Sequence, residues 1–91
     1  MDAPDVFQAD ITITDPVGLH ARPAAVVVKT AGRYQAKVKI KFGNKQADAR
    51  SIIQLLGLGV KQGSPVTVVA EGADAEEALQ AVLSVLAGEG V

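Results

Sequence analysis

The stretch Ala36-Lys37-Val38-Lys39-Ile40-Lys41-Phe42 predicts a β-strand, because apolar residues and lysines alternate along it without a break. Successive side chains of a strand point to opposite faces, so the lysines share one face and the apolar residues the other. Gly43-Asn44 follows as a turn signal, and residues 45–49 are predicted to return as a short second strand. A sheet whose lysines point to water has one open face, which antiparallel pairing permits.

The segments on either side complete a predicted order of β-α-β-β-α-β-α. Further strands are predicted at residues 8–14 and 66–70, and helices at residues 21–31, 51–58 and 75–86. Residues 1–7 are predicted to be an irregular lead-in. Before the last helix, Asp74 and Glu77 have the spacing of a capping box, in which each side chain binds a backbone N–H of the first turn.

Length and composition predict a single domain over residues 1–91 with enough apolar content, 48%, for its own core. Three helices cannot bury their apolar stripes on one another and leave a four-stranded sheet bare. We therefore expect an α+β fold, an open-faced β-sandwich with the three helices on one face of an antiparallel sheet.

The segment Gly18-Leu19-His20-Ala21-Arg22-Pro23-Ala24-Ala25 holds the only histidine of the chain, at the predicted start of a helix. A helix start offers free N–H groups and a partial positive charge to an anion. Imidazole is a nucleophile near neutral pH, and arginine binds phosphate oxygens in a fork. We therefore predict that His20 accepts a phosphoryl group, held by the Arg22 side chain and the backbone N–H groups of Ala21 and Arg22. From the residues alone, a surface histidine without function stays open as the alternative.

The same segment closely resembles the active-site motif of the histidine-containing phosphocarrier family, HPr, of the phosphoenolpyruvate-dependent phosphotransferase system. Arg50-Ser51-Ile52-Ile53 through Leu58-Gly59 resembles the second signature of that family, a serine that starts a short apolar helix. The resemblance spans residues 9–86 and implies the strand order 1-4-2-3. Gln54 departs from the glycine, and Leu56 from the methionine, that are frequent in the family, which bears on the choice of partner.

The resemblance implies a phosphocarrier that takes a phosphoryl group from phospho-enzyme I, through Nδ1 of the histidine, and passes it to enzyme IIA domains for sugar uptake. Such a carrier is a stoichiometric intermediate of a relay rather than an independent enzyme. Ser51, a good helix N-cap in its own right, is also implied as a regulatory site for an HPr serine kinase/phosphorylase. The short helix is apolar on too many sides to be buried entirely, so we expect a partner-docking surface formed by Ile52, Ile53 and Leu56.

Charge and composition limit the kinds of partner and ligand that we expect the protein to bind. The net charge of −1 and the few aromatic residues argue against nucleic acid, so the three lysines are expected to form a solvated strand face. With no cysteine and one histidine, no Cys/His zinc site is expected, and no cofactor is predicted. The acidic start lacks an apolar run behind it, and no segment has the length needed to span a bilayer, so we expect neither a signal peptide nor membrane insertion, and a cytoplasmic protein. The small size and the modest apolar patch favour a monomer. A nitrogen-branch paralogue and a non-catalytic interaction module remain the alternatives.

Overall fold

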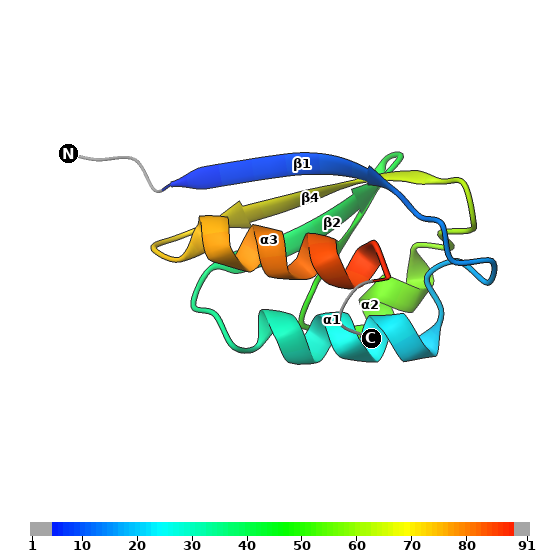
Figure 1. Ribbon diagram of the computed structural model, residues 1–91, viewed down its shortest axis with the longest axis horizontal. Coiled ribbons are helices and arrows are strands. Elements are labelled where there is room, and N and C mark those ends of the chain that lie inside the picture. The colour runs from blue at the N-terminus through cyan, green and yellow to red at the C-terminus, as the bar shows by residue number, and fades with distance from the viewer. Residues whose placement is uncertain (1–4, 89–91) are drawn as a thin grey trace.

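The computed structural model describes residues 5–88, which form strands and helices in the predicted order (Figure 1). The strands are β1 (Val6–Thr12), β2 (Lys37–Phe42), β3 (Lys45–Asp48) and β4 (Pro65–Glu71), and the helices are α1 (Ala21–Ala31), α2 (Ile52–Gly57) and α3 (Ala75–Leu86). The bounds of α1 and α3 are those that the apolar spacing predicts.

The strands form one antiparallel sheet with the order β1-β4-β2-β3, which confirms the expected order. The last strand of the chain thus lies between the first and the second. β1 and β2 both pair with β4, over the registers Val6↔Glu71 to Thr12↔Pro65 and Lys37↔Glu71 to Lys41↔Thr67. This crossing of the chain brings the loop that follows β1 next to the segment that precedes β4.

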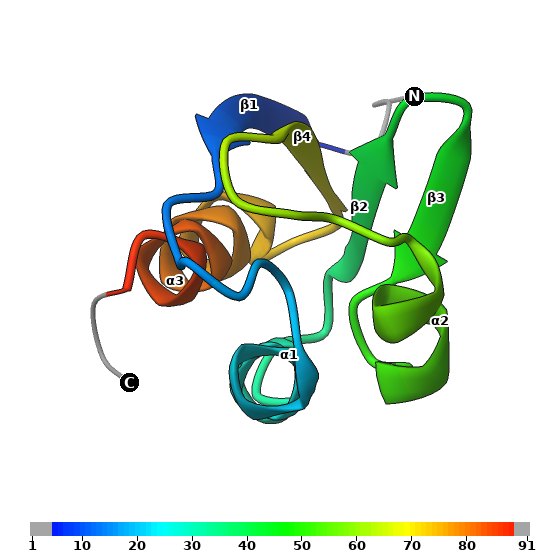
Figure 2. The same ribbon diagram turned by 90° about the vertical axis from the view of Figure 1, so that its right-hand side faces the viewer.

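All three helices lie on one side of the sheet, as expected for an open-faced sandwich (Figures 1 and 2). α3 packs across β1, β4 and β2, whereas α1 packs against α3 and α2. Val38 and Ile40 of β2 and Val68 of β4 are among the largest fully buried side chains of the core between the layers. Within residues 5–88, no helix has the length and apolar character needed to cross a membrane.

The opposite face of the sheet is open, and the three lysines of β2 lie on it. Lys37, Lys39 and Lys41 are exposed, while Val38 and Ile40 between them are buried. The strand therefore alternates as predicted. The apolar side chains of β2 pack toward the helices, and the ammonium groups of its lysines stay in water.

The first strand begins and ends two residues earlier than the predicted range of 8–14. Val6 and Phe7, expected in an irregular lead-in, pair with Glu71 and Ala70 of β4. Pairing fixes these limits, because Thr12 lies opposite Pro65, the first residue of β4. The strand end is thus set by a partner far along the chain, which local alternation cannot reveal.

The predicted capping box at α3 is wrong. Asp74 does occupy the N-cap position, but its side chain makes no cap hydrogen bond. Its carboxylate instead accepts hydrogen bonds from the N–H groups of Gln35 at 3.0 Å and Ala36 at 2.8 Å. Asp74 therefore ties the loop between α1 and β2 to the start of α3.

The carboxylate of Asp74 should make the fold sensitive to acid. The hydrogen bond from Gln35 lowers the pKa of Asp74, partial burial opposes this, and the Ala36 N–H and the Arg50 charge lower it further. A lowered pKa in the folded state stabilises the protein above the unfolded value of about 4, and this stabilisation is lost as the pH falls through the folded pKa. We expect Asp74→Asn to lower the urea midpoint at pH 7 and to flatten its decline into acid. Glu76→Gln, in the same first turn, is the control, and equal acid profiles for Asp74→Asn and the unmodified protein would contradict the assignment.

Candidate functional site

His20 is the N-cap residue of α1, at the position that the sequence predicts. Its backbone is extended, with φ −105° and ψ −174°, and its side chain makes no cap hydrogen bond. The imidazole is one-third exposed. Its carbonyl accepts the first bond of the helix, from the Ala24 N–H at 3.0 Å. An N-cap side chain that caps nothing leaves the imidazole available for another task.

The first-turn N–H groups of α1 are available to an anion. Among residues 5–88 the N–H groups of Ala21 and Arg22 have no hydrogen-bond acceptor, and the first turn contains no acidic residue. Pro23 contributes no N–H, so the available donors are those nearest His20. Aligned donors at a helix start are a general anion-binding arrangement, and the structure places two of them beside the imidazole.

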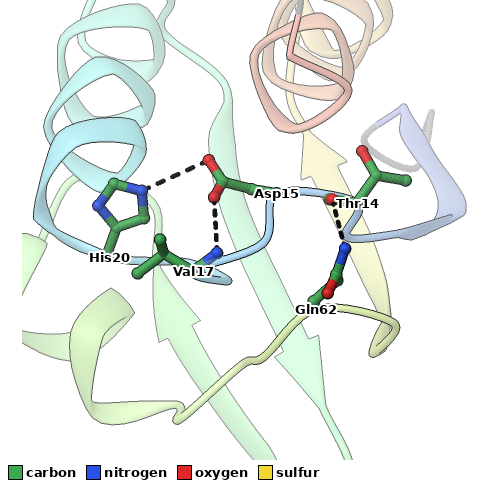
Figure 3. Close-up of polar contacts among 5 residues, drawn as sticks. All are labelled: Thr14, Asp15, Val17, His20 and Gln62. Carbon is green, nitrogen blue, oxygen red and sulfur yellow. Dashed lines mark hydrogen bonds and ion pairs between the residues drawn. The ribbon is translucent and has the colours of Figure 1, made fainter.

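The loop that carries His20 is held against the segment before β4. Ile13 exchanges backbone hydrogen bonds with Ser64 (2.9 Å) and Gly63 (2.7 Å), and the Leu19 N–H donates to the Val60 carbonyl at 3.0 Å. Figure 3 shows the Gln62 side chain donating to the Thr14 carbonyl, at 3.3 Å. These contacts span about fifty residues of sequence. They hold the loop, and with it the His20 imidazole, in a fixed position.

Gly18 allows this close contact. Its φ of +80° lies in the left-handed region, and a Cβ there would lie 2.4 Å from the Val60 carbonyl oxygen and 2.7 Å from the Cα of Lys61. Glycine is the one residue that meets both conditions without strain.

Asp15 is a site residue that the sequence analysis missed. Its Oδ2 lies 3.4 Å from Nε2 of His20, and its Oδ1 accepts a hydrogen bond from the Val17 N–H at 2.9 Å (Figure 3). The Val17 hydrogen bond lowers the pKa of Asp15; partial burial opposes this, and His20 and then Arg22 lower it further. A carboxylate a few residues before a lone histidine was the available signal.

Arg22 lies on the wall of a hollow of about 510 Å³ beside His20, between the 13–20 loop and the end of α3. Its side chain is exposed, and within residues 5–88 no carboxylate forms an ion pair with it. The guanidinium can therefore reach an anion at the helix start. The residues described contain no group of three or more His, Cys, Asp or Glu side chains that could hold a metal ion.

Ser51 is the N-cap of α2, as predicted, and its Oγ accepts a hydrogen bond from the Gln54 N–H at 3.2 Å. Arg50 does not turn its guanidinium to this helix start. It donates instead to the backbone carbonyls of Ala31 and Tyr34, at the end of α1. A cation at a helix C-terminus is favoured by the helix dipole, which explains the choice.

The three predicted docking residues are exposed on α2, most of all Ile53 at 81%. Leu55 and Leu58 of the same segment are buried in the core, so the helix is divided as its excess of apolar residues predicts. We call Ile52, Ile53 and Leu56 the apolar patch. Val17, in the loop before His20, is a further exposed apolar residue, at 68%.

Fold and site together define a class of protein: an open-faced α+β sandwich that presents a histidine at the N-terminus of a helix. The family described as the phosphorylation site of the PTS HPr component matches residues 7–87. The chain therefore belongs to the HPr family.

Solved structures agree with this assignment. The phosphocarrier protein HPr of Bacillus anthracis is 38% identical, with a TM-score of 0.83 over 88% of this chain and 95% of that one. The histidine-containing phosphocarrier protein of Mycoplasma is 35% identical, with a TM-score of 0.86 over 90% and 93%. The Bacillus subtilis catabolite-repression protein Crh, described as a domain-swapped dimer, is 34% identical, with a TM-score of 0.75 over 89% and 93%.

Proposed function

We propose that residues 1–91 act as one cytoplasmic phosphocarrier domain. It accepts a phosphoryl group on His20 from phospho-enzyme I and passes it to enzyme IIA domains, in a relay that serves sugar uptake. The observation that carries the proposal is the partly exposed imidazole at the start of α1, next to backbone N–H groups and an arginine without an ion-pair partner among the described residues. Membership of the HPr family supports the same reaction.

The site suits a group that must be held and then released. The N–H groups of Ala21 and Arg22 and the guanidinium of Arg22 can meet phosphoryl oxygens, and charge-assisted hydrogen bonds contribute about 1.5–3 kcal/mol each. The site is open to solvent, so a partner protein can approach in line with the N–P bond. Phosphoryl transfer requires positioning and charge stabilisation above all, and two proteins can supply these together.

A direct test uses enzyme I, labelled phosphoenolpyruvate and this protein, followed by a purified enzyme IIA domain. We expect one labelled phosphoryl group per chain, stable in alkali and labile in acid as a phosphoramidate is, which then moves to the IIA domain. Absence of label on the chain, with an active enzyme I and a positive carrier control, would refute the proposal. A panel of sugar-branch and nitrogen-branch IIA domains separates those two alternatives by their rates.

The apolar patch is the proposed docking surface, and Ile53 is its most exposed member. We expect Ile53→Lys to weaken binding to enzyme I or a IIA domain about tenfold, because a charge replaces an apolar contact at the interface. Folding stability should change by no more than about 0.5 kcal/mol, because the side chain is exposed. Titration calorimetry measures the affinity. Val6→Lys, at an exposed apolar position on the edge strand β1, is the matched control, and equal loss in both variants would contradict the assignment.

Ser51 is the proposed regulatory site for an HPr serine kinase/phosphorylase. It starts α2, next to Ile52 of the apolar patch, so a phosphate there would add charge at the docking surface. Mass spectrometry after kinase treatment, with Ser51→Ala beside it, tests this assignment.

Crh, which resembles this chain, is a catabolite-repression protein, and a purely regulatory role is the second candidate function. We propose a monomer as the working form, to be checked by sedimentation equilibrium, since Crh is described as a dimer.

A further inference from the structure

Asp15 and His20 form the only ion pair within residues 5–88. The transfer reaction proposed above gives this ion pair no role. Asp15 is held in place by its own turn. Its Oδ1 accepts from the Val17 N–H at 2.9 Å, and its carbonyl accepts from the Gly18 N–H at 2.8 Å. With both bonds made, Oδ2 is left to face the imidazole (Figure 3).

The contact is made to one ring nitrogen, Nε2, at 3.4 Å. A carboxylate only accepts hydrogen bonds, so it favours the ring form in which Nε2 carries the proton. In a neutral imidazole the other nitrogen then has the free lone pair, as in catalytic histidines that are oriented by a carboxylate. The distance is at the long end for a hydrogen bond, which is common before a reaction partner is bound.

We propose that Asp15 is a positioning residue, which keeps the proton on Nε2 of His20 and so leaves Nδ1 as the nucleophile. This inference rests on the proposed function, and it assigns a role to a residue outside the motif. In the transfer, the Nδ1 lone pair forms the N–P bond, while the bond from phosphorus to the donor atom breaks and its electron pair stays with the donor. The Nε2 proton is not lost, so the phosphorylated ring carries a positive charge, which the Asp15 carboxylate faces.

The Arg22 guanidinium also acts on this carboxylate and is the last of the causes that lower the pKa of Asp15. Among the described residues, Asp15 is the one acidic group that contacts His20. Because both side chains are partly exposed, at 33% and 41%, the contact has the strength of a surface ion pair rather than a buried one.

The chain contains a matched control for the turn itself. Asp48, before α2, makes the same two bonds: its Oδ1 accepts from the Arg50 N–H at 2.9 Å, and its carbonyl accepts from the Ser51 N–H at 2.9 Å. Asparagine supports such turns as aspartate does, so Asp15→Asn and Asp48→Asn remove the charge and keep the turn. Of the two aspartates, Asp15 is the one that contacts a histidine.

The test measures ¹⁵N shifts of the His20 ring in the unphosphorylated protein, at a pH where the ring is neutral. We expect the unmodified protein and Asp48→Asn to carry the proton on Nε2 almost exclusively, and Asp15→Asn to show a mixture of the two ring forms. Acceptance from phospho-enzyme I should slow about fivefold in Asp15→Asn, on the scale of one exposed ion pair. Part of the label should move to Nε2. The same ring form and the same rate in Asp15→Asn and the unmodified protein would overturn the inference. If no variant accepts phosphate, the proposed function fails, and the ring-form measurement still decides the role of Asp15.

Discussion

His20→Ala should abolish phosphoryl acceptance from phospho-enzyme I. The chain has one histidine, and the variant removes the only imidazole while leaving the helix N–H groups and Arg22 in place. Those groups can bind an anion but offer no nucleophile, so no N–P bond can form. Electrophoresis under alkaline conditions, after incubation with labelled phosphoenolpyruvate and enzyme I, measures the loss.

The fold should survive this substitution. The His20 side chain makes no cap hydrogen bond and is one-third exposed, so we expect a stability change within about 0.5 kcal/mol. Arg22→Ala is the companion variant. It keeps the nucleophile and loses one anion-binding side chain, so acceptance should fall about tenfold without vanishing. Label retained by a folded His20→Ala protein would mean that another residue is the acceptor.

Gly18→Ala should cause the largest loss of stability among single methyl additions to the loop. The φ of +80° costs an alanine about 1–2 kcal/mol. The added Cβ would also lie 2.4 Å from the Val60 carbonyl oxygen, and relieving such a clash costs about 1–3 kcal/mol more. The same shift would stretch the bond from the Leu19 N–H to Val60, so phosphoryl acceptance should fall together with stability. Urea unfolding measures the first effect and the labelling assay the second.

Gly63→Ala separates the two costs. Gly63 has a similar φ of +87°, but a Cβ there would meet nothing within 4 Å. We expect it to lose the backbone contribution alone, about 1–2 kcal/mol, and to keep the site intact. Losses of equal size in the two variants would show that the contact with the 60–61 segment is not what requires glycine at position 18.

Alternation and helical spacing were sufficient to predict the order of the elements and the exact limits of α1 and α3. Both signals are local, since they depend on which face of one element is buried. The strand order could not be predicted from these local signals. It came from the resemblance to a family and not from any pattern within a strand. The limits of β1 were missed for a related reason: they are set by the pairing with β4, more than fifty residues away.

At the site, the residues of the two sequence motifs were predicted, whereas Asp15, which contacts His20, was not. His20, Arg22 and Ser51 lie where the motifs place them, at two helix starts. Asp15 was not among the predicted site residues, because nothing in Asp15-Pro16-Val17-Gly18 says which way a carboxylate turns. Asp74 was expected to cap its own helix, yet its carboxylate accepts from backbone N–H groups of the loop between α1 and β2. Arg50 likewise donates to backbone carbonyls at the end of α1 and just beyond it. Side chains of this kind choose among nearby backbone donors and acceptors, and that choice is made only when distant segments meet.

The bare face of the sheet offers a practical handle. Lys39 lies within β2, exposed between the buried Val38 and Ile40, and the chain has no cysteine. Lys39→Cys would therefore give a unique thiol for a fluorophore or a surface tether, with the imidazole and the patch around Ile53 left clear for incoming proteins. Labelled in this way, the protein could report each encounter with a donor or an acceptor one molecule at a time.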